Sequence, residues 1–372
     1  MATAAQGEDA GMDDRPSRRS VVRPPFPGPL VPGRPAGAEI RRCAKTVGTR
    51  CDMLAGNSQP TAAPDVTALN IKVMERLART WSERVAVRKD RLDLDAYYDP
   101  TIPDFPIEII PFARDPEFQE AYDRLDDRAK LRYLAAVWIG YNERVIFIED
   151  DIVQPVCGLL RKNRLPGVAD PVVQQVIAQT QVDEQFHTLM CLEVCESARR
   201  RHGIRDYRLP PPLLAKRMRE QLDAADGPYA HALIRTAYGT VSETTIHDYL
   251  RKLSTVETIQ PLNRIHTELH RRDETAHGTI FLELARSIYA NLDSGAKELF
   301  HDIFERALHD SVEIDVDFWA STLPYVEARD WTPFVQRLRL DLAQKRIGRD
   351  YTGLRQLLDD LGITARLDFV FE

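Results

Sequence analysis

LHRRDETAHGTI, residues Leu269 to Ile280, is the stretch that decides the fold of this chain. If it is helical, its spacings of four and three residues place His270, Glu274 and His277 on one face, because such side chains are neighbours on a helix. A cluster of this kind is either a metal site inside a helical bundle or a polar face exposed to water. The pattern in the rest of the chain distinguishes the two.

Composition limits the classes of protein to which the chain can belong. Its 372 residues are 43% hydrophobic, enough to bury a large core. A net charge of −7 argues against nucleic acid or an anionic membrane as the main partner. The five cysteines form no CxxC pair, so we expect a reducing compartment without a disulfide framework. With no apolar run of membrane length and no apolar signal core, we expect a cytoplasmic protein.

Residues 1–64 differ from the remainder. They contain nine of the 24 prolines and no sustained apolar period, so we expect a disordered Pro-rich tail. From residue 65 the apolar period becomes helical, and no stretch shows convincing alternation with a period of two. We therefore expect an all-α domain over residues 65–372.

Helix boundaries follow from proline, glycine and capping residues. The segment 97–106, YYDPTIPDFP, is too rich in proline for a helix and is expected to lie as a strap across the bundle. Pro155 is expected to kink or end the helix that contains Glu149. The expected helices cover residues 65–85, 126 to beyond 149, 170–203, 213–225, 229–254 and 261–291, with a further one from residue 294.

Three Glu-x-x-His pairs occur in the chain, and a single pair would be weak evidence for a metal. The pair Glu298 and His301 is predicted to face solvent, on the side of its helix opposite Leu299 and Ile303. The other two pairs, in DEQFH from Asp183 and DETAH from Asp273, lie within apolar stripes. Burying an ionised carboxylate is unfavourable unless a cation or an ion pair compensates it.

Each of these two buried pairs follows a helix with one inward-facing glutamate. Glu149 precedes the first pair and Glu243 precedes the second, so a helix with Glu and a helix with Glu-x-x-His occur twice. This arrangement is typical of four-helix bundles that bind two iron or manganese ions. Carboxylates are hard, bridging ligands, and imidazoles add nitrogen donors. Asp183 and Asp273 are expected to accept hydrogen bonds from the ligand imidazoles, and His270 is expected to be an additional ligand.

With these residues, the chain resembles the AurF-type p-aminobenzoate N-oxygenases, ferritin-like di-iron proteins that oxidise arylamines in natural-product and antibiotic pathways. The resemblance covers residue 65 to the C-terminus, including the 97–106 loop. His270 separates this family from ferritins, rubrerythrins and methane-monooxygenase-type enzymes. The residues that match the family's metal ligands, which would act in catalysis through the metals, are Glu149, Glu184, His187, Glu243, His270, Glu274 and His277.

The resemblance implies a ferritin-like four-helix-bundle core with flanking helices, two iron ions with manganese as a competitor, and O₂ as cosubstrate. It implies oxidation of an arylamine to the hydroxylamine, and on to nitroso or nitro, through a peroxo-diferric intermediate. It also implies a homodimer. No flavin or nicotinamide fingerprint is visible, so electrons are expected from a separate reductase or ferredoxin. Arg144 and Tyr141 are the candidate contacts to a carboxylate on the substrate. The alternatives are a surface salt bridge for Arg144 and packing in the core for Tyr141.

Two other classes stay open at the level of sequence. A ferritin-like ferroxidase, a manganese catalase or a ribonucleotide reductase small subunit would use a similar set of carboxylates. The reductase subunit would also need a radical tyrosine, for which Tyr141, Tyr238 and Tyr249 are candidates. A helical interaction module without a metal is the third possibility.

Overall fold

A computed structural model describes residues 66–86 and 93–371, and the part of the chain that it describes contains helices and no strand. The predicted all-α fold is therefore confirmed. The expected tail, residues 1–64, lies outside the described residues. No helix in the described part of the chain combines the length and apolarity needed to cross a membrane.

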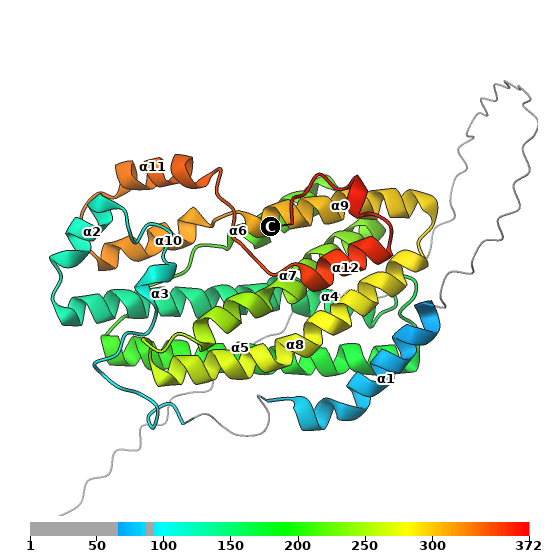
Figure 1. Cartoon of the computed structure of the whole chain (residues 1–372), viewed down its shortest axis with the longest axis horizontal. Coiled ribbons are helices and arrows are strands. Elements are labelled where there is room, and N and C mark those ends of the chain that lie inside the picture. The colour runs from blue at the N-terminus through cyan, green and yellow to red at the C-terminus, as the bar shows by residue number, and fades with distance from the viewer. Residues whose placement is uncertain (1–65, 87–92, 372) are drawn as a thin grey trace, which may run out of the picture. The chain divides into compact units, whose positions relative to one another are not determined.

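Four long helical elements form the central bundle, which Figure 1 shows together with its flanking helices. The bundle consists of α3 (Asp127–Ile148) with its continuation, α5 (Pro171–His202), α7 (Gly227–Ser254) and α8 (Pro261–Ala290). Helix α3 packs against α5, and α7 packs against α8. Helix α1 (Val66–Arg84) packs on α5 and α8 from outside the bundle.

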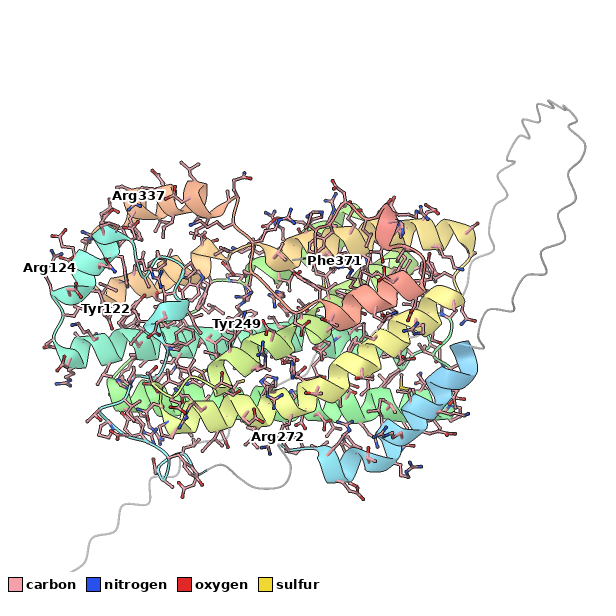
Figure 2. The ribbon with its side chains drawn as sticks, in the orientation of Figure 1. Tyr122, Arg124, Tyr249, Arg272, Arg337 and Phe371 are labelled. Carbon is pink, nitrogen blue, oxygen red and sulfur yellow. The ribbon has the colours of Figure 1, made fainter. Side chains whose placement is uncertain are left out.

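Shorter elements surround the bundle. They are η1 (Ile107–Ile109), α2 (Pro116–Asp123), α6 (Leu213–Ala224), α9 (Ser294–Val312), α10 (Val316–Thr322), η3 (Leu323–Tyr325), α11 (Thr332–Leu342), α12 (Thr352–Asp360) and η4 (Thr364–Arg366). Arg337, labelled in Figure 2, joins α11 to the start of α2 by an ion pair with Glu117 at 3.0 Å. Arg124 follows α2 and pairs with Glu327 at 3.0 Å. These exposed pairs contribute little stability individually.

Capping residues set the ends of the bundle helices as the sequence predicts. Asp126 accepts a hydrogen bond from the backbone N–H of Ala129 at 2.8 Å, and Asp170 accepts one from Val172 at 2.8 Å. Gly203 ends α5 with a φ of 65°, a left-handed conformation that costs glycine no Cβ clash. Helix α5 therefore has the length needed to carry its Glu-x-x-His motif across the bundle.

The helix before Pro155 neither ends nor continues as a regular α-helix. It passes into a π-helical turn, η2 (Glu149–Val153), and then into α4 (Gln154–Leu160). Proline has no N–H to donate to the preceding turn, and the π-turn widens the helix directly before it. Glu149 is the first residue of this turn.

The proline-rich segment 97–106 fastens the start of α8, as the predicted strap requires. The buried Gln260 side chain accepts a hydrogen bond from the N–H of Asp99 at 3.0 Å and donates to the carbonyl of Ile102 at 2.7 Å. Asn263 donates to the carbonyl of Asp104 at 2.8 Å. The strap thus fixes the end of the helix from which three predicted metal ligands project.

The pair Glu298 and His301 does not share one solvated face, so that prediction is wrong in part. Glu298 is exposed and pairs with Arg366, but His301 is only 5% exposed, whereas the apolar Leu299 is 38% exposed. The C-terminal segment covers α9 on this side, and the N–H of Asp368 donates to Glu305 at 3.0 Å. This cover comes from distant sequence and could not be inferred from the helix alone.

Candidate metal centre

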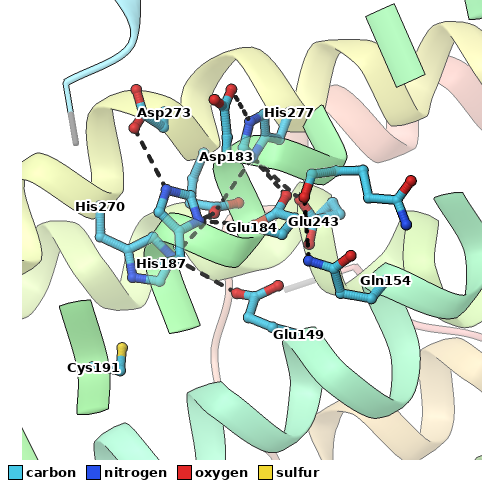
Figure 3. A network of polar contacts seen from close by, with 12 residues as sticks. Glu149, Gln154, Asp183, Glu184, His187, Cys191, Glu243, His270, Asp273 and His277 are labelled. Atoms are coloured by element: carbon cyan, nitrogen blue, oxygen red, sulfur yellow. Dashed lines mark hydrogen bonds and ion pairs between the residues drawn. The ribbon is translucent and has the colours of Figure 1, made fainter. Parts of the chain in front are cut away.

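All seven predicted ligands meet in one buried layer inside the bundle. Figure 3 shows this layer, with every ligand except Glu274 labelled. Glu149, at the start of η2, is the most exposed of them at 4%. Along α5, apolar residues such as Ile177 pack on one side of the layer and Val194 packs on the other, in two separate apolar clusters. The polar layer is therefore enclosed by apolar packing at both ends.

The two motif histidines lie between the two motif glutamates. His187 Nδ1 is 2.8 Å from Glu184 Oε2 and 3.1 Å from Glu274 Oε1. His277 Nδ1 is 2.8 Å from Glu184 Oε1 and 3.5 Å from Glu274 Oε1. Each glutamate therefore contacts the histidine of its own motif and that of the other.

The remaining predicted ligands extend this core. His270 Nε2 lies 3.0 Å from Glu274 Oε1 and 3.8 Å from Glu149 Oε1. Glu243 Oε2 lies 3.8 Å from His277 Nδ1. Ligand atoms within 4.8 Å of one another form three overlapping sets: Glu149, His187, His270 and Glu274; Glu184, His187, Glu274 and His277; and Glu149, Glu184 and Glu243.

Burial and the charges within the cluster determine which of its glutamates are protonated and which are ionised. Burial and the carboxylates of Glu184 and Glu274 hold the pKa values of Glu149 and Glu243 well above the usual range. Burial acts in the same direction on Glu274, yet the neighbouring imidazoles, His277 first, hold its pKa well below the usual value. The same imidazole lowers the pKa of Glu184. The ionised carboxylates are therefore those of the two motifs.

The three histidines also differ in the direction of their pKa shifts. Burial lowers the pKa of His277, but Glu184 and Glu274 raise it more, so that it lies well above its usual value. Glu184 and neighbouring acceptors do the same for His187. The pKa of His270 is lowered by burial and by His187, so its imidazole is neutral. Without a cation the cluster is thus balanced by protons, which a bound metal would replace.

The donor set fits a pair of divalent cations. Within the cluster, buried carboxylate oxygens of Glu149, Glu243 and Glu274 have no hydrogen-bond partner among the described residues. Buried acceptors without a partner are costly, and a cation at their centre would satisfy them. Carboxylates and imidazoles are the ligands found in di-iron and di-manganese bundles.

The two aspartates of the motifs are paired crosswise with the histidines (Figure 3). Asp273 Oδ2 lies 3.5 Å from His187 Nε2, and Asp183 Oδ2 lies 3.3 Å from His277 Nε2. Each aspartate thus holds the histidine ring of the other motif. The Nδ1 of that ring faces the cluster. A carboxylate in this position orients the ring and fixes its tautomer.

Helix α1 and Ala86, which follows it, complete this outer layer with contacts that the sequence did not predict. Trp81 Nε1–H donates to both oxygens of Asp183, at 3.0 and 2.9 Å, and the backbone N–H of Ala86 donates to Asp273 Oδ1 at 2.9 Å. Burial lowers the pKa of Arg84, whereas the charges of Asp183 and Asp273 raise it. The only signal in the sequence was the place of Trp81 in the apolar stripe of the first helix.

A cavity of about 70 Å³ adjoins the cluster between α3 and α7. Glu149 and Glu243 line it, together with both predicted substrate contacts, Tyr141 and Arg144. The Tyr141 hydroxyl is buried without a hydrogen-bond partner among the described residues. The ring of Tyr249, labelled in Figure 2, lies 5.5 Å from that of Tyr141. The cavity therefore joins the candidate metal ligands to polar groups that lack partners.

Arg349 also lines this cavity, and nothing in its local sequence had indicated a role. Its Nη2 donates to the carbonyl of Ser311 at 3.1 Å, and its Nε has no partner among the described residues. Burial and the charge of Arg144 lower the pKa of Arg349 to about 10, so its guanidinium is charged at neutral pH. Among the described lining residues, no carboxylate forms an ion pair with either arginine. The pair of arginines would suit an anionic group in the cavity.

Of the three tyrosines considered for a radical, Tyr238 lies elsewhere. Its hydroxyl donates to Asp310 and accepts a hydrogen bond from Gln221, and it does not line the cavity. One helical turn from the cluster, His266 Nε2 is 2.9 Å from Asn142 Oδ1 and 3.8 Å from Cys191 Sγ. Burial, followed by the neighbouring imidazoles of His270 and His187, lowers the pKa of His266 to about 3, so this ring is a neutral hydrogen-bonded neighbour.

The similarity of this chain to solved structures is weak. The chain is 14% identical to the dimanganese(II) NrdF of Streptococcus sanguinis, with a TM-score of 0.40 and coverage of 83% and 93% of the two chains. An R2-like ligand-binding oxidase with a reconstituted metal cofactor gives 15% identity, a TM-score of 0.40 and coverage of 85% and 99%.

The sequence comparisons are much stronger. The chain is 35% identical over 299 residues to the 4-aminobenzoate N-oxygenase of Streptomyces thioluteus, which covers 80% of this chain and 88% of that protein. Residues 70–362 match the family model described as p-aminobenzoate N-oxygenase AurF, and this range contains every predicted ligand. The chain belongs to the AurF family of p-aminobenzoate N-oxygenases.

Proposed function

We propose that the protein is a di-iron N-oxygenase that uses O₂ to oxidise an arylamine bearing a carboxylate. The observation that carries the proposal is the buried layer of four glutamates and three histidines, open to a cavity that holds two arginines. The Streptomyces thioluteus relative acts on 4-aminobenzoate, which has an amine at one end and a carboxylate at the other. Manganese is the metal expected to compete with iron.

When bound, two iron ions would supply the activation of O₂. The chain's own residues hold the reactants. In this proposal Glu149 and Glu243 bind the metals and also line the cavity, so the metal pair would lie beside the bound substrate. Arg144 and Arg349 would bind the substrate carboxylate, which leaves the amine directed toward the glutamates. Apolar packing around the layer excludes water from the reacting groups.

The overall reaction balances with two external electrons. The arylamine, O₂, two electrons and two protons give the hydroxylamine and one water, and further rounds would give the nitroso and nitro compounds. We propose a separate reductase or ferredoxin as the donor. We further propose a cytoplasmic homodimer, with one catalytic domain over residues 65–372 and the tail, residues 1–64, outside it.

The test is to add ferrous iron without oxygen, count the bound iron, and then add ¹⁸O₂ with 4-aminobenzoate. Two irons per chain and an ¹⁸O-labelled hydroxylamine, nitroso or nitro product are expected. Fewer than two irons per chain would refute the di-iron centre. Full iron with unlabelled, unchanged amine would refute the N-oxygenase and favour a ferroxidase. Glu243→Gln should bind less iron than the wild type, because it keeps the side-chain size and removes one ligand charge.

A further inference from the structure

Two hollows lie back to back on the side of the bundle covered by α6, α9 and α10. The inner one is the cavity of about 70 Å³ beside the candidate metal centre, and the outer one is a surface hollow of about 480 Å³. Four segments line both, and in each of them two consecutive residues face opposite hollows. The pairs, outer residue first, are Leu213 and Leu214, Val312 and Ser311, Asp317 and Phe318, and Arg346 and Ile347. At these places the wall between the hollows is therefore a single layer of chain.

One of the four segments lies outside regular secondary structure. It belongs to residues 345–350, which connect α11 to α12 and form the thin orange trace between those helices in Figure 1. Within it, Ile347 and Arg349 line the inner cavity, whereas Arg346, Gly348 and Asp350 are exposed. This alternation is that of an extended chain laid over the cavity.

Two hydrogen bonds join this connecting segment to the end of α9. The backbone N–H of Ile347 donates to the carbonyl of Val312 at 2.9 Å, and Arg349 Nη2 donates to the carbonyl of Ser311 at 3.1 Å. The other three segments of the wall belong to α6, α9 and α10 and are held by the hydrogen bonds of their helices. The connecting segment is therefore the part of the wall that opens at the lowest cost.

The acidic residues of the outer hollow already have partners. Glu313 pairs with Arg217 at 3.0 Å, and Asp317 pairs with Arg339 at 2.5 Å. Asp315 is 3% exposed, and its oxygens accept hydrogen bonds from backbone N–H groups in the first turns of α6 and α10. These carboxylates thus maintain the wall and leave the other cations of the hollow without a counter-charge.

Lys345 and Arg346 are those cations. Both are exposed, and neither forms an ion pair with a carboxylate among the described residues. The guanidinium of Arg346 lies over the ring of Phe369, 5.7 Å from its centroid. Both charges line the outer hollow directly before Ile347, the first inward residue of the connecting segment. Cations gathered in a concave surface raise the local concentration of an anionic ligand.

We propose that the outer hollow is a first binding site for the carboxylate-bearing arylamine and that residues 345–350 open to admit it, an inference that rests on the proposed function. Lys345 and Arg346 attract the carboxylate at the surface. The N–H of Ile347 then leaves Val312, the segment moves outward, and the substrate enters the inner cavity. When the segment closes, Arg349 binds the carboxylate from inside, so the bound substrate holds the segment shut.

The first experiment measures how fast 4-aminobenzoate binds to the ferric protein without a reductant, where it binds without being oxidised. In Lys345→Ala with Arg346→Ala, association in stopped flow at low salt should be about tenfold slower, with dissociation unchanged. High salt should remove most of this difference by screening the wild-type charges. Lys162→Ala with Arg164→Ala is the control, because it removes the same charge from exposed positions that line neither hollow.

A second variant, Gly348→Ala, tests the opening itself. A Cβ added at Gly348 would meet no atom within 4 Å, so the closed segment should be undisturbed, while alanine restricts the backbone that must move. Association and dissociation should both become slower by the same factor, about two- to fivefold, at an unchanged Kd. Gly295→Ala on α9 is the control, since a Cβ there would make only an ordinary contact with Asp293, at 3.5 Å.

Hydrogen exchange provides an independent measurement. The amide of Ile347 should exchange more slowly when 4-aminobenzoate is bound to the ferric protein, because Arg349 then holds the segment closed. Unchanged exchange would contradict the coupling of substrate to closure. Wild-type binding rates in both the Lys345 and Arg346 double variant and Gly348→Ala would overturn the entry site. A change confined to dissociation in the double variant would also overturn it.

Failure of the proposed function would be seen separately. Iron-loaded, reduced wild-type protein would then bind 4-aminobenzoate with the expected rates and return it unoxidised in the presence of O₂. Wild-type protein that does not bind 4-aminobenzoate at all would refute both the substrate class and the entry site.

Discussion

His270 is a neutral nitrogen donor held inside a cluster of charged groups. Its ring contacts Glu274 and lies 4.0 Å from the ring of His187, and its pKa is lowered by burial and by that neighbour. It can therefore bind a metal without first losing a proton, unlike His187 and His277. This readiness is the property that distinguishes it from the other two histidines.

Replacing His270 by alanine should preserve the helical fold and weaken binding of one metal ion. We expect roughly a 10- to 100-fold loss of affinity for that ion, in the range found for residues that tune a metal site. Titration with ferrous iron, read by metal analysis, measures the change. His309→Ala, a half-buried histidine on α9 that lies outside the cluster of ligands, is the control. Full iron loading and normal amine oxidation in the His270 variant would show that this residue is a bystander.

Arg349 and Arg144 give a prediction about substrate charge. Substituting either arginine by methionine removes a charged hydrogen-bond donor, worth about 1.5–3 kcal/mol. The KM for 4-aminobenzoate should rise roughly 10- to 100-fold. A neutral arylamine such as aniline should be affected little, because it has no carboxylate to lose a partner.

The comparison of the two substrates separates binding from folding. Arg355→Met, an exposed position on α12, should leave both KM values unchanged. If Arg349→Met weakened the two substrates equally, the guanidinium would be shaping the cavity and not binding an anion. An Arg349→Lys variant should recover only part of the affinity, since an ammonium lacks the planar fork of arginine.

Among the elements, the π-helical turn η2 sets the direction of Glu149. A π-turn contains one residue more than an α-helical turn, so the helix after it is rotated relative to the helix before it. Deleting the exposed Asp150 should restore α-helical geometry. Either Glu149 would then turn away from the cluster of ligands, or the buried side of α4 would turn away from the core. Bound iron should then fall to about one per chain or less. Asp150→Ala is the control, and full iron content in the deletion would contradict this role of η2.

The elements also explain what the sequence could and could not predict. Helix periodicity and caps identified the bundle, and apolar surroundings identified the ligand stripes, because these are properties of single helices. The contact between Trp81 and Asp183 joins residues 102 positions apart, and that between Ala86 and Asp273 joins residues 187 apart. Arg349 and the buried face of His301 likewise depend on distant segments. Such contacts leave no periodic trace in the chain.

For the molecule as a whole, the protonation of the cluster predicts how stability changes with pH. The raised pKa values of His187, His277, Glu149 and Glu243 mean that the folded metal-free protein binds more protons than the unfolded chain. Their contribution is complete below the unfolded values and is lost as pH rises through the folded ones. Glu184 and Glu274, with lowered pKa values, act oppositely and only as pH falls below their ordinary value of 4.5.

The metal-free protein should therefore lose stability as pH rises above 6.5, the ordinary value for histidine. Iron should reverse this trend, since binding releases the protons and is favoured at higher pH. Thermal unfolding at pH 6 and pH 8.5, with a chelator and with ferrous iron, measures both effects. A Tm of the chelated protein that does not fall between these values would contradict the assigned protonation states.

The crosswise contacts within the cluster have a consequence for how the metals are loaded. Glu184 and Glu274 each contact both motif histidines, and each motif aspartate holds the ring of the other motif. The first ion to bind therefore removes protons from, and orders, side chains that the second ion also needs. The two ions should bind cooperatively, so that chains with a single ion are scarce at half saturation. Loading in this manner would protect the cell from a half-filled centre that reacts with O₂ without oxidising an amine.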